Sequence, residues 1–307
     1  MAASPHMQEV LDQLWADAEA AAEMTEAPSP DAIRQMMEEG GTYFKRTPDT
    51  TDLYLVDANG VQCEWVVAKG ADPDIRTIYF HGGGYVGGSI HTHRTLCSDL
   101  SREIGGAVLN VGYRLAPEHK APAQYDDAMA AYKFMLENGP KKEGKPKACF
   151  ICGDSAGGGL TLSLMMGLRD EGLPLPNAAA TLSAWTDLTA SGKSFETNAK
   201  KDPMASKGLI EMLAGWVLDS GVDAKDFRVS PLFGDFSGLS PVLMQVGKDE
   251  ALLDDTLMAA EKAKDAGVDV TVEEWDDVFH VWHSLGSHVP ESREAVENVG
   301  EFLRKHL

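Results

Sequence analysis

Hydrophobic positions recur along the chain with two different periods, and the change between them divides the sequence. Toward the N-terminus apolar residues return at helical spacing, which predicts helices over 8–24 and 30–39. The period changes after residue 51. Two apolar runs, 53–56 and 61–68, flank an Asp-Ala-Asn-Gly turn at 57–60, a pattern typical of an antiparallel hairpin.

Beyond the hairpin, short apolar runs alternate with longer helical stretches. The runs cover 75–80, 107–111, 148–152, 178–184, 242–246 and 268–275, and the helices cover 92–104, 122–137, 157–171, 255–266 and 290–306. This alternation predicts βαβ units and an α/β fold. We expect a mostly parallel sheet of about eight strands, its first pair antiparallel, with helices on both faces.

The alternation is interrupted between the runs that end at 184 and begin at 242. Here a polar, loop-like stretch at 186–203 precedes a single predicted helix at 206–219. The interval is too long for a simple connection, which indicates an inserted functional element. Together with the N-terminal helices it would form a helical cap over the sheet. The predicted organisation is N-terminal cap helices at 1–45, the first part of the catalytic domain at 46–185, a cap insertion at 186–226 and the second part of the catalytic domain at 227–307.

The charge balance narrows the choice of partners. The chain has 27 basic and 48 acidic residues, a net charge of −21, which repels phosphate backbones and anionic lipids. We therefore expect neither nucleic-acid binding nor membrane insertion, and no apolar run approaches the roughly 18 residues of a membrane span.

The N-terminus lacks the features of a secretory signal, and four scattered cysteines do not suggest a disulfide framework, so the expected location is cytoplasmic. The Cys-x-x-Cys pair at 149 and 152 lies on a predicted buried strand, which favours core packing.

The most specific chemical signal is the stretch Gly-Asp-Ser-Ala-Gly-Gly at 153–158. An apolar run precedes it and a helical pattern follows it, which is the strand–turn–helix context of a nucleophile elbow. Glycines on both sides leave room for a strained turn that presents Ser155 at a helix N-terminus. Ser155 is therefore the candidate nucleophile.

A second signal, His-Gly-Gly-Gly-Tyr at 81–85, directly follows the predicted strand at 75–80. Consecutive glycines expose backbone N–H groups, which an oxyanion hole requires. We expect the amides of Gly83 and Gly84 to form this site with that of Ala156, the residue after the nucleophile. We interpret His81 as a loop anchor.

A serine nucleophile needs a base and an acid, and on this fold they follow in the order acid, then histidine. Asp249 lies just past the predicted strand at 242–246 and is the candidate acid. Its neighbours within 247–255 remain alternatives. His280 follows the strand at 268–275 by a short loop and is the candidate base, with His283 as the alternative. His91 and His93 have zinc-ligand spacing but no evident third ligand, so no metal is expected.

The sequence resembles the hormone-sensitive-lipase-like group of α/β-hydrolases, the bacterial family IV esterases. The resemblance rests on HGGGYVGGS at 81–89, YRLAPEH at 113–119, GDSAGG at 153–158, the Gly-x-Asp-Glu-x-Leu-x-Asp-Asp pattern at 247–255 and HVW at 280–282. It implies an α/β-hydrolase fold with a cap, a Ser155–Asp249–His280 triad, and an oxyanion hole from Gly83, Gly84 and Ala156. It also implies structural roles for Arg114 and Glu118. The pair Ala184-Trp185 departs from the Pro-Trp pair expected in this family.

Together these features predict a carboxylesterase that hydrolyses short-to-medium-chain acyl esters, without a metal or organic cofactor. An amidase, deacetylase or lactonase with the same triad is the alternative, followed by a non-catalytic ligand-binding receptor on the same scaffold. Tyr85, Asp154 and Trp185 are candidate substrate-binding residues. The expected partner is a small ester, and a homodimer is compatible with the sequence.

Overall fold

The computed structural model of the protein describes residues 3–23, 27–40 and 50–307. One eight-stranded sheet crosses it in the order β1-β2-β4-β3-β5-β6-β7-β8. The strands are β1 (Thr51–Ala58), β2 (Val61–Ala68), β3 (Asp72–Phe80), β4 (Gly106–Val111), β5 (Ala148–Asp154), β6 (Ala178–Leu182), β7 (Val242–Gly247) and β8 (Val270–Trp275). The strand pairs β1–β2 and β2–β4 are antiparallel, and all other pairs are parallel. The predicted α/β class and antiparallel first pair are confirmed.

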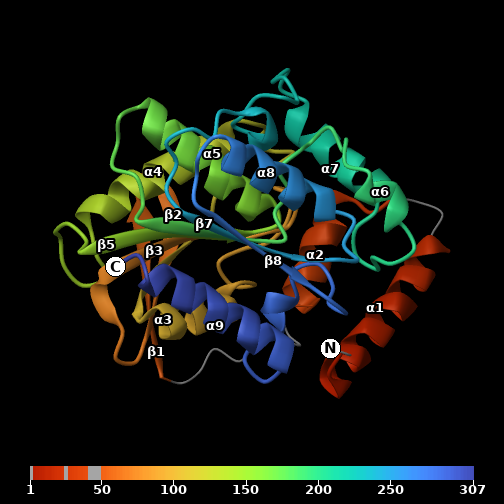
Figure 1. Cartoon of the computed structure of the whole chain (residues 1–307), viewed down its shortest axis with the longest axis horizontal. Helices are drawn as coiled ribbons and strands as arrows, with labels where there is room; N and C mark the ends of the chain where they lie inside the picture. The colour runs from red at the N-terminus through yellow and green to blue at the C-terminus, as the bar shows by residue number, and fades with distance from the viewer. Residues whose placement is uncertain (1–2, 24–26, 41–49) are drawn as a thin grey trace.

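Helices cover both faces of this sheet (Figure 1). One face carries α3 (Arg94–Ile104) and α9 (Pro290–Arg304), and the other carries α4 (Ala123–Glu137), α5 (Ala156–Asp170) and α8 (Leu253–Asp265). Each lies within one turn of its predicted limits. Both layers are apolar inside: one core forms beneath α4, α5 and α8, and a second between the sheet and the α3–α9 pair. No helix in the described ranges is long and apolar enough to cross a bilayer.

Four further helices lie at one side of the sheet (Figure 1). They are α1 (Pro5–Ala22), α2 (Pro30–Gly40), α6 (Ser194–Thr197) and α7 (Lys207–Leu218). Of these, the short α6 is not predicted from the sequence. The predicted helix end at residue 24 and the domain boundary between 45 and 46 lie outside the described residues, and the division into cap and catalytic domains remains a prediction.

Two of these helices, α2 and α7, contact the loop that follows β3. On α2, Arg34 donates to the carbonyl oxygens of Val86 and Ala116 and pairs with Glu118. On α7, Leu213 is so close to Gly84 that a Cβ built there would lie 2.6 Å from its Cδ1. The glycine-rich loop therefore lies between the sheet and the helices α2 and α7.

Candidate active site

Ser155 occupies the sharp turn between β5 and α5. Its backbone has φ +50° and ψ −119°, a conformation that a residue with a side chain adopts only under strain. The neighbouring glycines allow the turn: a Cβ at Gly157 would lie 1.9 Å from the carbonyl oxygen of Phe80, and one at Gly153 would lie 2.3 Å from that of Gly157. No other residue type fits at these two positions without backbone movement.

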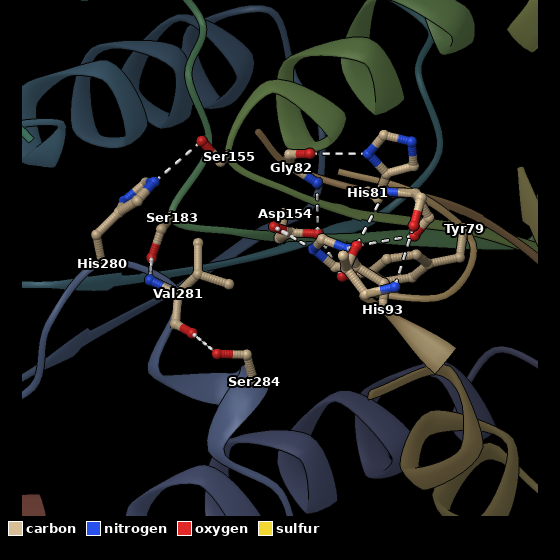
Figure 2. A network of polar contacts seen from close by, with 12 residues as sticks. Tyr79, His81, Gly82, His93, Asp154, Ser155, Ser183, His280, Val281 and Ser284 are labelled. Atoms are coloured by element: carbon tan, nitrogen blue, oxygen red, sulfur yellow. Dashed lines mark hydrogen bonds and ion pairs between the residues drawn. The ribbon is translucent and has the colours of Figure 1, made fainter. Parts of the chain in front are cut away.

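The structure brings His280 to this serine, as the sequence predicts. His280 lies in the loop between β8 and the short helix η2 (Trp282–Leu285), and its Nε2 is 2.9 Å from Ser155 Oγ (Figure 2). The alternative, His283, is fully buried and contacts Gln245 Oε1 through Nε2. Burial lowers the pKa of His283 to about 3, so its imidazole stays neutral.

The prediction of Asp249 as the acid is wrong, because the carboxylate that contacts His280 belongs to Glu250. Glu250 Oε2 lies 2.7 Å from His280 Nδ1, and the side chain is completely buried. Asp249 instead pairs with Lys201 at 3.0 Å, with 42% of its side chain exposed. The turn after β7 explains the difference, because the backbone amide and carboxylate of Glu250 both bond back to Gly247 and so turn this residue inward.

Side chains from two distant segments hold Glu250 in place. Its Oε1 accepts hydrogen bonds from the Gly247 amide at 2.6 Å and from the Ser183 hydroxyl at 2.8 Å. From the predicted cap insertion, Asn198 donates to the carbonyl oxygens of residues 248 and 250, and Asp202 accepts from the amide of residue 251. The carboxylate is thus fixed by groups at the ends of β6 and β7, and the insertion holds the backbone around it.

The electrostatics of His280 follow from this arrangement. Burial is the largest single effect and disfavours the charged imidazolium, but the hydrogen bond and charge of Glu250, together with the charges of Asp202 and Asp154, outweigh it. The pKa of His280 is therefore raised above its ordinary value. A histidine in this setting readily accepts a proton from a neighbouring hydroxyl.

Three candidate oxyanion donors lie on two segments beside Ser155. Gly83 and Gly84 have φ of +110° and +62°. The amides of Gly83, Gly84 and Ala156 donate to no other group in the described part of the chain. The adjacent Gly82 amide donates to Asp154 Oδ1 at 3.0 Å, which ties the loop to the nucleophile turn. The geometry leaves these three amides free for a ligand.

His81 anchors the start of this loop. Its ring stacks on Tyr113 with centroids 4.2 Å apart, and its Nδ1 lies 2.8 Å from the carbonyl oxygen of Gly82 (Figure 2). Burial and the nearby His93 lower the pKa of His81 to about 3. A neutral, enclosed ring suits the structural role predicted for it.

Two predicted substrate-binding residues are enclosed in the protein instead. Asp154 is 2% exposed, and its two oxygens contact Tyr79, Gly82 and His93. Trp185 is fully buried and donates to a backbone carbonyl. Both side chains are therefore enclosed, and their predicted role in substrate binding stays a prediction. Tyr85 is also buried, but its hydroxyl has no partner among the described residues, so its role stays a prediction.

Arg114 and Glu118 make structural contacts. Arg114 forms a bidentate pair with Asp127, at the start of α4. Glu118 pairs with Arg34 on α2, a contact that sequence reasoning missed because the two residues lie 84 positions apart. The Tyr-Arg-Leu-Ala-Pro-Glu-His stretch thus connects the sheet to the predicted cap.

Comparisons with known proteins agree with this architecture. Residues 77–284 match the family model described as α/β hydrolase fold. An acetyl-hydrolase of Streptomyces hygroscopicus is 42% identical over 251 residues, which cover 81% of this chain and 82% of that protein. An esterase of Acinetobacter venetianus is 32% identical over 89% of this chain and 88% of its own.

Among solved structures, an esterase from the bacterial hormone-sensitive lipase family superimposes with a TM-score of 0.91 at 40% identity. The alignment covers 100% of this chain and 99% of that one. With a family model that spans most of the chain and relatives at this level of identity, the chain belongs to the α/β-hydrolases, in their hormone-sensitive-lipase-like group of esterases.

Proposed function

We propose that the protein is a carboxylesterase that cleaves short-to-medium-chain acyl esters through an acyl-enzyme intermediate. The observation that carries the proposal is the continuous hydrogen-bonded chain from Ser155 through His280 to Glu250, with distances of 2.9 and 2.7 Å. A hydroxyl, an imidazole and a buried carboxylate in this order form a nucleophile, a base and the group that orients the base.

In the first half-reaction His280 Nε2 takes the Ser155 proton as Oγ attacks the ester carbonyl carbon. Glu250 accepts from Nδ1–H, which selects the tautomer with a free Nε2 and stabilises the imidazolium that forms. His280 then gives its proton to the leaving alcohol as the C–O bond breaks. Water repeats the cycle, so that the acid is released and the serine regenerated.

The amides of Gly83, Gly84 and Ala156 would bind the tetrahedral oxyanion. Support comes from the absence of another acceptor for these N–H groups among the described residues and from the positive φ of Gly83 and Gly84. Removing one oxyanion donor typically costs about 3 kcal/mol of barrier stabilisation.

Named relatives support an ester substrate with a small acyl group, since they include an acetyl-hydrolase and an ethyl acetate hydrolase. The same site chemistry could act on amides or lactones, and a matched ester and amide pair separates these reactions. The acidity of the chain supports binding of small molecules and not of nucleic acids, and a cytoplasmic location is part of the proposal. A homodimer is also part of the proposal.

The test is replacement of the nucleophile. Ser155→Ala should lower the rate of p-nitrophenyl acetate hydrolysis by about 10⁶-fold, because it removes the attacking atom. Ser163→Ala is the matched control: this serine lies on the same helix and bonds the carbonyl oxygen of residue 227, away from the site. A Ser155→Ala rate within tenfold of the parent would refute the assignment.

A series of p-nitrophenyl esters would then test the acyl length, with faster turnover of long chains contradicting the proposal.

A further inference from the structure

We propose that Ser183 is a positioning residue, whose hydroxyl sets the orientation of the Glu250 carboxylate and the backbone beside His280 at the same time. The inference rests on the proposed function, in which those two side chains act as acid and base. Sequence motifs do not point to Ser183, which lies just after β6 and is far from Glu250 and His280 in the sequence.

One hydroxyl joins three segments that are far apart in the sequence. Ser183 Oγ donates to Glu250 Oε1 at 2.8 Å. It accepts from the Val281 amide at 3.2 Å, the contact drawn in Figure 2. Its own backbone amide donates to the carbonyl oxygen of Gln245 on β7. Ser183 is fully buried, so water does not compete for these contacts.

The first contact decides which carboxylate oxygen faces the histidine. Oε1 receives both donors, from Ser183 and from the Gly247 amide, and this leaves Oε2 directed at His280 Nδ1. Without the hydroxyl, Oε1 keeps a single donor, and the side-chain torsions of Glu250 are less restricted. The acid could then turn away from the imidazole.

The second contact acts on the backbone next to the base. Val281 has φ +59°, an uncommon conformation for a β-branched residue. Its amide finds its acceptor in Ser183, and such strained residues persist only where surrounding contacts hold them. Ser183 itself has φ +50°, which aims its side chain between the two loops. A hydroxyl is required because the position needs one donor and one acceptor on a single small group.

Ser194→Ala provides a matched control. Ser194 is also buried, donates to the carbonyl oxygen of residue 251 and accepts from the amide of residue 254. It therefore makes the same two kinds of bond beside the same loop, without contact to Glu250 or His280. A general loss of loop stability should affect both variants equally.

The experiment compares Ser183→Ala, Ser194→Ala and the parent in hydrolysis of p-nitrophenyl acetate. We expect Ser183→Ala to lower kcat about tenfold with KM within twofold, and Ser194→Ala to change neither beyond twofold. In a Glu250→Gln background the Ser183→Ala change should cost less than threefold, because the hydroxyl then orients an amide that already presents NH₂, and not an acceptor, to His280. Equal kcat for the two serine variants, or the same loss in both backgrounds, would overturn the proposal.

A spectroscopic readout separates this outcome from failure of the proposed function. The Nδ1 proton of His280, shared with Glu250, should give a far-downfield NMR resonance in the parent and in Ser194→Ala. In Ser183→Ala it should shift or be lost to exchange. An unchanged resonance would overturn the positioning role even if the protein hydrolysed no ester, whereas a parent protein without esterase activity but with a shifted resonance in the variant would refute only the function.

Discussion

The nucleophile side and the acid side of the site are held by different kinds of contact. Around Ser155 the restraint is steric, since β5, α5 and the end of β3 approach so closely that only glycine fits at 153 and 157. Around Glu250 the restraint is polar: hydrogen bonds from Ser183 and Gly247 hold a buried carboxylate, and Asn198 of the insertion holds the backbone carbonyl of the same residue. The nucleophile side therefore depends on the absence of side-chain atoms, and the acid side depends on the presence of particular hydrogen-bond donors.

On the acid side, Glu250→Gln hardly changes the shape of the side chain but should cause the largest loss of kcat. In Glu250→Gln the Ser183 hydroxyl and the Gly247 amide still need an acceptor, so the new amide oxygen takes the place of Oε1. The NH₂ group then faces His280 Nδ1. The imidazole must then carry its proton on Nε2, where it cannot accept one from Ser155. We expect kcat to fall about 10⁴-fold, measured with p-nitrophenyl acetate.

Asp249→Asn provides the control for that prediction. Asp249 is half-exposed and pairs with Lys201, and solvent-exposed ion pairs contribute little. Its kcat should stay within twofold of the parent. A larger loss in Asp249→Asn than in Glu250→Gln would restore Asp249 as the acid.

On the nucleophile side, Gly157→Ala should act by displacing backbone. The added Cβ would meet the carbonyl oxygen of Phe80 at 1.9 Å, so β3 and α5 must separate. Misplacement of catalytic groups by about 1 Å can cost 10²-fold in rate, and we expect a loss of that size in kcat/KM.

The matched glycine for this change is Gly215 on α7, where a Cβ would meet nothing within 4 Å. Gly215→Ala should keep full activity and raise the free energy of unfolding by up to about 1 kcal/mol, measured by urea denaturation. Full activity in Gly157→Ala would show that the turn is less constrained than its geometry implies.

The smallest effect concerns pH. Only the neutral imidazole of His280 can accept the serine proton, and Glu250 raises the pKa of this histidine. The kcat/KM of the parent should therefore rise with pH through a midpoint above the ordinary histidine value of about 6.5. The midpoint is read from a pH profile with a non-ionising ester. A midpoint below that value would mean that burial, and not Glu250, dominates at the base.

The sequence is sufficient to predict the nucleophile side almost completely. Strand, glycine-rich turn and helix are local in the chain, so the placement of Ser155 and of the glycine loop follows from neighbouring residues. The acid is different, because residues 249 and 250 both follow β7 immediately. Which one turns inward depends on the Gly247 turn, on Ser183 after β6 and on Asn198 in the insertion.

The polar stretch at 186–203 illustrates the same limit. Its composition predicts a loop, which the structure confirms apart from α6, but many of its polar residues are buried. Asp187, for example, is fully enclosed and accepts from the amides and hydroxyls of Thr189 and Ser191. Polarity alone cannot distinguish a solvated loop from one whose polar groups satisfy each other.

The packing of α1 has a consequence for the order of folding. Met7 is completely buried against the segment that carries His280, with Phe279 and Trp282 in the same apolar cluster. Ser4, which caps α1, also bonds Glu291 on α9, 287 positions away in the sequence. During synthesis α1 must therefore wait, without its partner surface, until almost all of the residues described here have left the ribosome. Closing so long a loop is entropically costly, so the histidine side of the site should be among the last parts to assemble.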